Sequence, residues 1–122
     1  MMVIMASIIF RSMSQSLSAV FITTGSMESA TNLARGLVEN QLAACVNIVN
    51  GVTSVYKWEG QMNVDPELIL MVKTRTELIG ELTEWVKANH SYSCPEVIAL
   101  PIIGGNSAYM DFVLGGTKCP SV

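Results

Sequence analysis

Residues 43–59 read AACVNIVNGVTSVYKWE, and residues 67–74 read ELILMVKT. Both stretches are rich in apolar, β-branched and aromatic residues, which favour strands. The first stretch predicts one long strand that bends at Asn50-Gly51, because this pair is typical of a turn, bulge or kink. Residues 60–66 contain glycine, asparagine, aspartate and proline, so we expect them to form the hairpin connection to the second strand.

The second of these strands is apolar on both faces. Side chains alternate along a strand, so Leu68, Leu70 and Val72 share one face. Ile69 and Met71 then share the other face. Helices of the same chain can cover only one face of such a sheet. We therefore expect other subunits to cover the second face.

The segments on either side of the hairpin complete a βαββαβ order. Apolar residues recur at helical spacing within residues 30–38 and within 78–86, which predicts one helix before the hairpin and one after it. β-type runs at residues 18–24 and 97–102 supply the other strands, and residues 107–114 predict an extra C-terminal helix. We predict an α+β fold: a ferredoxin-like sandwich with an antiparallel sheet under two helices and long, bent second and third strands.

Composition indicates one domain that associates with itself. The chain has 122 residues, enough for a single domain, and 14% of them are charged, well below the roughly 25% of a typical domain. Spare apolar surface on a small domain is usually covered by further copies.

The net charge of −3 and the lack of a lysine or arginine cluster argue against nucleic acid as a partner. Three widely spaced cysteines without a Cys-x-x-Cys pair favour a reducing compartment, and we expect a cytoplasmic protein.

Residues 1–17 differ from the rest and are expected to be an N-terminal extension. Their apolar stretch, residues 1–10, is too short to span a bilayer, so stable membrane insertion is not expected. Two interpretations stay open: a disordered or loosely attached segment, or a mitochondrial leader, which the serines and the lack of acidic residues favour. The folded domain is expected to cover residues 18–118, with a short tail at 119–122.

Polar and aromatic residues gather near the predicted strand ends, where they are expected to line a cleft. Lys73 lies among apolar neighbours, so its ammonium needs a partner, for which Glu59 and Glu96 are the candidates. Plainer roles stay open as well: an ion pair across subunits for Lys73, and a subunit interface for Trp58 and Tyr92. The predicted ligand-binding residues are Trp58, Glu59, Lys73, His90, Tyr92 and Glu96.

Cys45 and His90 are the predicted metal ligands. Thiolate sulfur and imidazole nitrogen together suit copper, and other divalent cations also bind such donors. His90 is the only histidine, so a neighbouring subunit or solvent would have to complete the site. The alternatives are a small, buried apolar role for Cys45 and a helix C-cap for His90. No spacing singles out a nucleophile or an oxyanion hole, so an enzyme is not expected.

Four segments together resemble the CutA family, the divalent-cation tolerance proteins. They read LAACVN at residues 42–47, YKWEG at 56–60, MVKT at 71–74 and HSYSCPEVIALP at 90–101. All four stand in the family's order and spacing, and the resemblance extends over about residues 18–118. It implies a trimer of ferredoxin-like subunits that is similar in plan to the PII signalling proteins.

The resemblance also implies a function. Bacterial members are linked to copper tolerance and copper binding, and animal members to membrane anchoring of acetylcholinesterase. We expect a homotrimer that binds divalent or soft metal ions, copper among them, at clefts between subunits and acts in metal tolerance. The alternatives are a trimeric scaffold that docks or anchors a partner protein, and a PII-like protein that signals through a small ligand.

Overall fold

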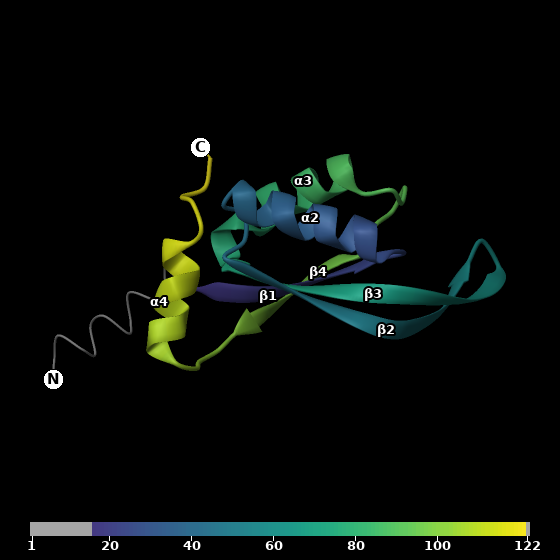
Figure 1. The fold of residues 1–122 in the computed structure, drawn as a ribbon, viewed down its shortest axis with the longest axis horizontal. Helices are drawn as coiled ribbons and strands as arrows, with labels where there is room; N and C mark the ends of the chain where they lie inside the picture. Colours follow the sequence, from purple (N-terminus) through teal and green to yellow (C-terminus); the bar gives the residue numbers. More distant parts are fainter. Residues whose placement is uncertain (1–15, 122) are drawn as a thin grey trace, which may run out of the picture.

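The computed structural model describes residues 16–121 and confirms the predicted α+β fold and order of elements (Figure 1). The elements are β1 (Leu17–Thr24), α2 (Met27–Glu39), β2 (Cys45–Trp58), β3 (Gln61–Arg75), the 3-10 turn η1 (Thr76–Leu78), α3 (Ile79–Asn89), β4 (Val97–Ile102) and α4 (Ser107–Gly115). The four strands form one sheet in the order β2-β3-β1-β4, and every neighbouring pair is antiparallel.

Helices α2 and α3 lie together on one face of the sheet (Figure 1). The α2 helix begins at Ser26, whose side chain accepts a hydrogen bond from the Ser29 N–H at 3.1 Å and so caps the helix. Its apolar stripe packs on the sheet as the spacing predicts. The core residues from the two helices are Ala30, Leu33, Ala34, Leu37, Leu82 and Val86, and those from the strands include Val20, Ile22, Leu70 and Val72.

The other face of the sheet, which we call the open face, lies opposite α2 and α3, and α4 contacts it only at one end, beside Cys45. On this face Phe21 pairs with Met71 on one side and with Ile98 on the other. Ile98 is 53% exposed and Leu100 is 50% exposed, so the open face presents apolar side chains to solvent. The two apolar faces predicted for the second long strand are confirmed.

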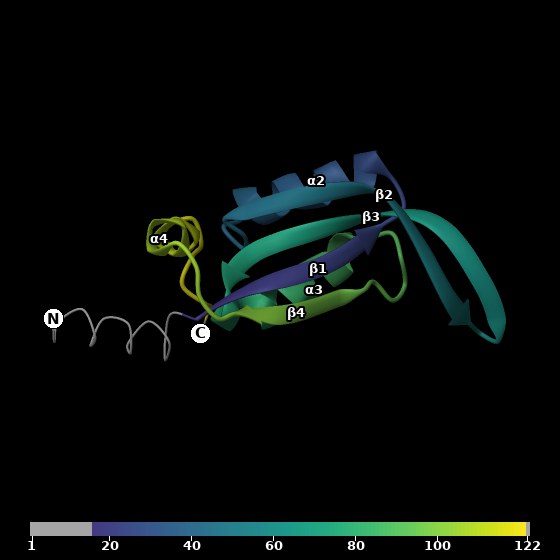
Figure 2. The same cartoon turned by 90° about the horizontal axis from the view of Figure 1, so that it is seen from below.

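Strands β2 and β3 extend beyond the rest of the sheet as a curved hairpin, and we call residues 52–67 the arm (Figure 2). The register shifts between Val49 and Val52, where Gly51 has a φ of 79° and forms the predicted bend. Trp58 pairs with Gln61, so the hairpin loop consists of Glu59 and Gly60 alone.

The predicted connection at residues 60–66 is therefore wrong, because residues 61–66 already belong to β3. Glu59 and Gly60 have φ values of 51° and 79°, as the central residues of a type I′ turn require. Glutamate is an unusual first residue for such a turn, which favours asparagine or aspartate there. The two-residue turn consequently carried a weak sequence signal.

The two ends of the described chain are attached to the domain. Leu17, which was assigned to the N-terminal extension, is the buried first residue of β1. Residues 1–15 lie outside the described residues, so both interpretations of the extension stay predictions. At the other end, Glu81 accepts hydrogen bonds from Lys118 and from the Ser121 N–H, which lower the pKa of Glu81 to about 2. Across the described residues, no helix is both long and apolar enough to cross a membrane.

Candidate functional site

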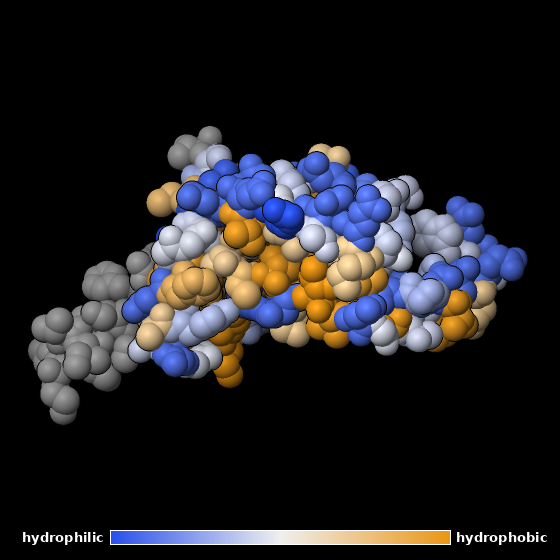
Figure 3. Space-filling model, viewed as in Figure 1, coloured by the Kyte–Doolittle hydropathy of each residue, from blue (hydrophilic) through white to orange (hydrophobic). Residues whose placement is uncertain are grey.

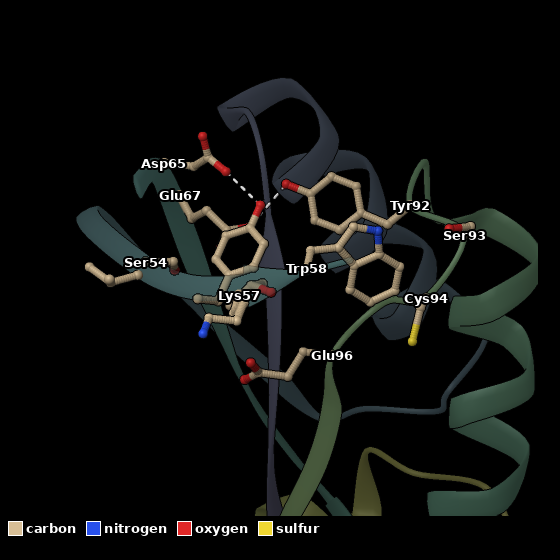
Figure 4. A pocket seen from close by; sticks show the side chains of 12 residues that line it. Ser54, Lys57, Trp58, Asp65, Glu67, Tyr92, Ser93, Cys94 and Glu96 are labelled. Atoms are coloured by element: carbon tan, nitrogen blue, oxygen red, sulfur yellow. Dashed lines mark hydrogen bonds between the residues drawn. The ribbon is translucent and has the colours of Figure 1, made fainter. Parts of the chain in front are cut away.

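A cleft of about 730 Å³ opens between the arm and the loop that joins α3 to β4 (Figure 4). The arm contributes residues 54–58 together with Asp65 and Glu67, and the loop contributes residues 92–94 and Glu96. Aromatic rings and carboxylates dominate the walls. The chemically informative lining residues are Tyr56, Lys57, Trp58, Asp65, Glu67, Tyr92, Cys94 and Glu96.

Two tyrosine–carboxylate hydrogen bonds organise this cleft (Figure 4). The Tyr56 hydroxyl donates to Asp65 Oδ2 at 2.5 Å, within the arm. The Tyr92 hydroxyl donates to Glu67 Oε2 at 2.9 Å and thereby ties the loop to the arm. Partial burial, followed by the bond to Glu67, raises the pKa of Tyr92 to about 12. The bond to Asp65 is the main cause that raises the pKa of Tyr56.

The cleft has an excess of negative charge. Its walls hold three carboxylates, those of Asp65, Glu67 and Glu96, against the single ammonium of Lys57. The ion pairs among residues 16–121 involve other acidic residues, so none of these carboxylates is neutralised by a cation. Glu96 also makes no hydrogen bond through its side chain within that range. The cleft is therefore an electrostatic trap for cations.

His90 lies just outside the cleft, and its ring is fully engaged. It is the C-cap residue of α3, which agrees with the alternative role given above. Nε2 lies 2.7 Å from the Thr23 carbonyl oxygen and must carry the proton that it donates. Nδ1 accepts a hydrogen bond from the Tyr92 N–H at 3.0 Å. Neither nitrogen is left for a metal ion, and the ring instead fixes the start of the loop that carries Tyr92.

Cys45 and Lys73 lie on the open face, away from the cleft. They are paired in register, and Lys73 pairs in turn with Ala19 of β1. His90 contacts β1 four residues further along, at Thr23, which is about 13 Å away along the strand. Within one subunit the structure does not bring Cys45 and His90 together. The Cys45 thiol instead approaches Tyr109 of α4, whose pKa it raises together with partial burial, the larger cause.

Lys73 donates hydrogen bonds to the Asn47 side chain and to the Met71 carbonyl oxygen. The expected pairing with Glu59 or Glu96 is wrong within the chain, because Glu59 lies at the arm tip and Glu96 lines the cleft. Trp58, Tyr92 and Glu96 do come together in the cleft.

Sequence reasoning missed Tyr56, Asp65 and Glu67. Their alignment depends on the hairpin register, in which Tyr56 pairs with Asn63 and Ser54 pairs with Asp65. Tyr56 and Asp65 are therefore diagonal neighbours on one face of the arm. A two-residue turn at Glu59 and Gly60 would have predicted this contact.

Comparison with known proteins identifies the family. The model of the family described as CutA1 divalent ion tolerance protein matches residues 18–115. The protein from Thermus thermophilus named divalent-cation tolerance protein CutA is 51% identical over 98 residues, which cover 80% of this chain and 95% of that protein. The rice protein named Protein CutA 1, chloroplastic, is 50% identical over 99 residues, which cover 81% of this chain and 56% of that protein. This chain thus spans little more than half the length of the rice relative and of its Arabidopsis thaliana counterpart.

Solved structures support the same relationship. The divalent cation tolerance protein of Thermus thermophilus superimposes with a TM-score of 0.81 at 49% identity, covering 84% of this chain and 99% of that one. The CutA1 structure from Oryza sativa superimposes with a TM-score of 0.82 at 48% identity, covering 84% of this chain and 94% of that one. Sequence and fold agree, and this chain belongs to the CutA1 divalent ion tolerance family.

Proposed function

We propose that this protein is a homotrimer that binds divalent cations, copper among them, at acidic clefts between its subunits and acts in metal tolerance. The relatives named for divalent-cation tolerance support this role in general terms. The free thiols of Cys45, Cys94 and Cys119 support a reducing, cytoplasmic environment. The role is one of binding, not catalysis.

The apolar surfaces support the trimer. The open face exposes Ile98 and Leu100, and the outer face of the arm exposes Val55, Met62 and Val64 at 66%, 65% and 63%. Figure 3 shows apolar side chains along the layer of strands and again on the arm. Two different apolar patches on one subunit favour a head-to-tail contact, in which the arm of one copy covers the open face of the next. Such contacts form a closed ring when the rotation between copies allows it.

The observation that carries the cation site is the set of unneutralised carboxylates in the cleft. Carboxylate oxygens are ligands for hard divalent cations. In the part of the chain that the structure describes, no three His, Cys, Asp or Glu side chains converge closely enough to hold an ion. The donors of one chain are therefore incomplete, and a second copy or water must supply the rest. An arm that reaches beyond its own sheet can provide that second set.

The thiol ligand that we propose for copper is Cys94, not Cys45. Cys94 lines the cleft together with Glu96, whereas Cys45 lies on the open face and both nitrogens of His90 are engaged. A thiol beside carboxylates offers a soft donor and hard donors in one place. We propose that Cys94 and Glu96 contribute to copper binding when the trimer assembles.

Calorimetric titration of the full chain with Mn²⁺ and Cu²⁺ tests the site. Glu96→Gln should weaken Mn²⁺ binding roughly 10–100-fold, since it removes a charged donor. Glu39→Gln is the matched control, because it removes an exposed carboxylate from the end of α2, away from the cleft and the arm. Cys94→Ser should weaken Cu²⁺ binding, while Cys45→Ser with His90→Ala should leave it unchanged. Equal losses in Glu39→Gln and Glu96→Gln, or dependence on Cys45, would overturn this assignment.

A further inference from the structure

Three large aromatic side chains surround the carboxylates of the cleft and stay exposed. Tyr56, Trp58 and Tyr92 are 42%, 49% and 39% exposed. Figure 4 shows the Trp58 and Tyr92 rings on the side of the loop, with Asp65 and Glu67 across from them on the arm. Half-exposed rings are costly to present to water, and a bare metal ion has no need of them. Such rings suit a ligand with an apolar surface.

The aromatic faces complement positive charge. The face of an aromatic ring carries partial negative charge and attracts cations, and indole attracts them more strongly than phenol or phenyl rings do. Both tyrosines donate their hydroxyl protons to carboxylates, at 2.5 Å for Tyr56 and 2.9 Å for Tyr92. Donation to an anion enriches the electron density of each ring. Rings and carboxylates therefore favour the same kind of ligand, a cation with an apolar body.

Hydrogen bonds within the cleft already use part of the acceptor capacity of its carboxylates. One oxygen of Asp65 and one oxygen of Glu67 already accept a phenol proton. These two carboxylates retain their charge but offer fewer acceptor sites. An alkylated ammonium group has few or no N–H donors and needs charge and aromatic contact more than acceptors. The remaining oxygens could also serve a primary ammonium, so the aromatic contact is what favours an alkylated cation.

We propose that the cleft binds small alkylammonium ions, held by the ring of Trp58 and the carboxylates of Glu67 and Glu96. The cleft volume of about 730 Å³ falls within the roughly 300–1,000 Å³ typical of small-molecule sites. This inference deepens the proposed function, because it places a second class of cation at the same acidic site. It depends on the aromatic walls, which the metal proposal does not use.

Tetramethylammonium and tert-butanol form a matched pair of probes, since they have similar size and shape and differ in charge. Saturation-transfer NMR on the methyl protons of each compound, with the full-length chain at fixed ionic strength, reports binding directly. We expect saturable transfer to tetramethylammonium and no saturable transfer to tert-butanol. Equal transfer to both compounds would mean that the cleft binds through apolar contact alone, which would overturn the proposal. The absence of transfer to either compound would overturn it as well.

Substitutions of single aromatic residues test whether the rings of the cleft bind tetramethylammonium. Trp58→Leu should weaken tetramethylammonium binding roughly tenfold, the order of one cation–π contact. Tyr109→Leu is the matched control, because Tyr109 is a comparably exposed aromatic on α4, outside the cleft. Equal losses in both variants would contradict the proposal.

The two proposals fail separately. Glu96→Gln should weaken both Mn²⁺ and tetramethylammonium binding, because its carboxylate serves both proposals. Loss of Mn²⁺ binding in the wild type with retained tetramethylammonium binding would overturn the metal site alone. The reverse pattern would overturn the alkylammonium site alone.

Discussion

Single residues connect the loop after α3 to the rest of the domain. His90 receives the Tyr92 N–H and donates to β1, and the Tyr92 hydroxyl then reaches Glu67 on the arm. This chain of hydrogen bonds crosses from the helix layer to the arm. The position of the Tyr92 ring in the cleft therefore depends on His90 on one side and on Glu67 on the other.

Glu67→Gln should lower the pKa of Tyr92 from about 12 but leave it above the ordinary value. Partial burial is the first cause of the raised pKa and survives the substitution, while the bond to a charged acceptor is lost. Alkaline absorbance titration measures this, with Tyr92→Phe as the reference that removes the signal of Tyr92. An unchanged titration curve would mean that Glu67 does not hold the phenol in solution.

The raised pKa of Tyr92 also predicts the pH dependence of stability. A phenol whose pKa is higher in the folded than in the unfolded state binds its proton more tightly when folded. Its contribution is fully present below about pH 10, the ordinary tyrosine pKa, and is lost as the pH rises towards the folded pKa of about 12. Urea unfolding across this range should show a smaller loss of stability in Tyr92→Phe than in the wild type.

His90→Ala should lower the free energy of unfolding by about 1–2 kcal/mol, since it removes two hydrogen bonds. It should leave Mn²⁺ binding at the carboxylates nearly unchanged. Urea denaturation at one fixed protein concentration measures the first effect, with the exposed neighbour Ser91→Ala as the control. A stable variant that no longer binds Cu²⁺ would restore the metal role expected from the sequence.

Residue types alone could predict only part of the cleft. Trp58, Tyr92 and Glu96 stand out because they are polar or aromatic residues at strand ends. The engagement of both nitrogens of His90 could not be predicted, because it depends on a β1 carbonyl 67 residues away in the chain. Lys73 was expected to need a charged partner, but a neutral amide on the adjacent strand suffices at this partly buried position.

At the scale of elements, one close contact joins the two helices on the sheet. Gly36 of α2 lies under the indole of Trp85 of α3, and a Cβ at position 36 would lie 2.5 Å from Trp85 Cη2. No side chain fits there unless the indole moves. Gly36 therefore allows α2 and α3 to approach each other with Trp85 between them.

Gly36→Ala should destabilise the protein by about 1–3 kcal/mol, the usual cost of overpacking, in spite of the better helix propensity of alanine. Gly80→Ala is the matched control, because Gly80 is also helical and a Cβ there meets nothing within 4 Å. The control should be neutral or stabilising by up to about 1 kcal/mol. Thermal unfolding at equal protein concentration measures the stability of both variants. A stabilising effect of Gly36→Ala would contradict the packing of Gly36 against Trp85.

The elements themselves were predictable because their patterns are local. The stripe at residues 30–38 and the β-type run at 97–102 each became the expected helix and strand. The position predicted for the hairpin turn was wrong for two reasons. Glutamate is an unusual residue at the first position of the turn, and Pro66, which is typical of turns, lies inside β3. That error also hid the register that places Tyr56 next to Asp65.

At the scale of the whole molecule, the described chain has an uncovered apolar sheet and an arm with an apolar outer face. The sequence indicated the first feature, since both faces of the second long strand are apolar. It also indicated the bend at Gly51, but not that the arm would extend beyond β1 and β4, because that extension depends on the strand register. One patch lies on the sheet and the other on the protruding arm, and the proposed head-to-tail contact pairs the two.

A head-to-tail ring makes a sharp prediction for two charged substitutions. Ile98→Lys damages the open face and Val64→Lys damages the outer face of the arm, at positions 53% and 63% exposed. Each variant alone should sediment as a subunit of 13.2 kDa, because every contact in the ring needs both patches. Met27→Lys, at an exposed apolar position on α2, is the control and should sediment like the wild type, as three copies.

Mixing the two variants then distinguishes the kinds of interface. The intact open face of Val64→Lys can receive the intact arm of Ile98→Lys, so a head-to-tail interface predicts a dimer of one copy of each. An interface that pairs like patches predicts a different result: each variant alone would still dimerise through its undamaged patch, and mixing would add nothing. Sedimentation velocity of the two samples and their mixture separates these cases. A mixed dimer that also regains Mn²⁺ binding would show that one arm and one open face complete the cation site.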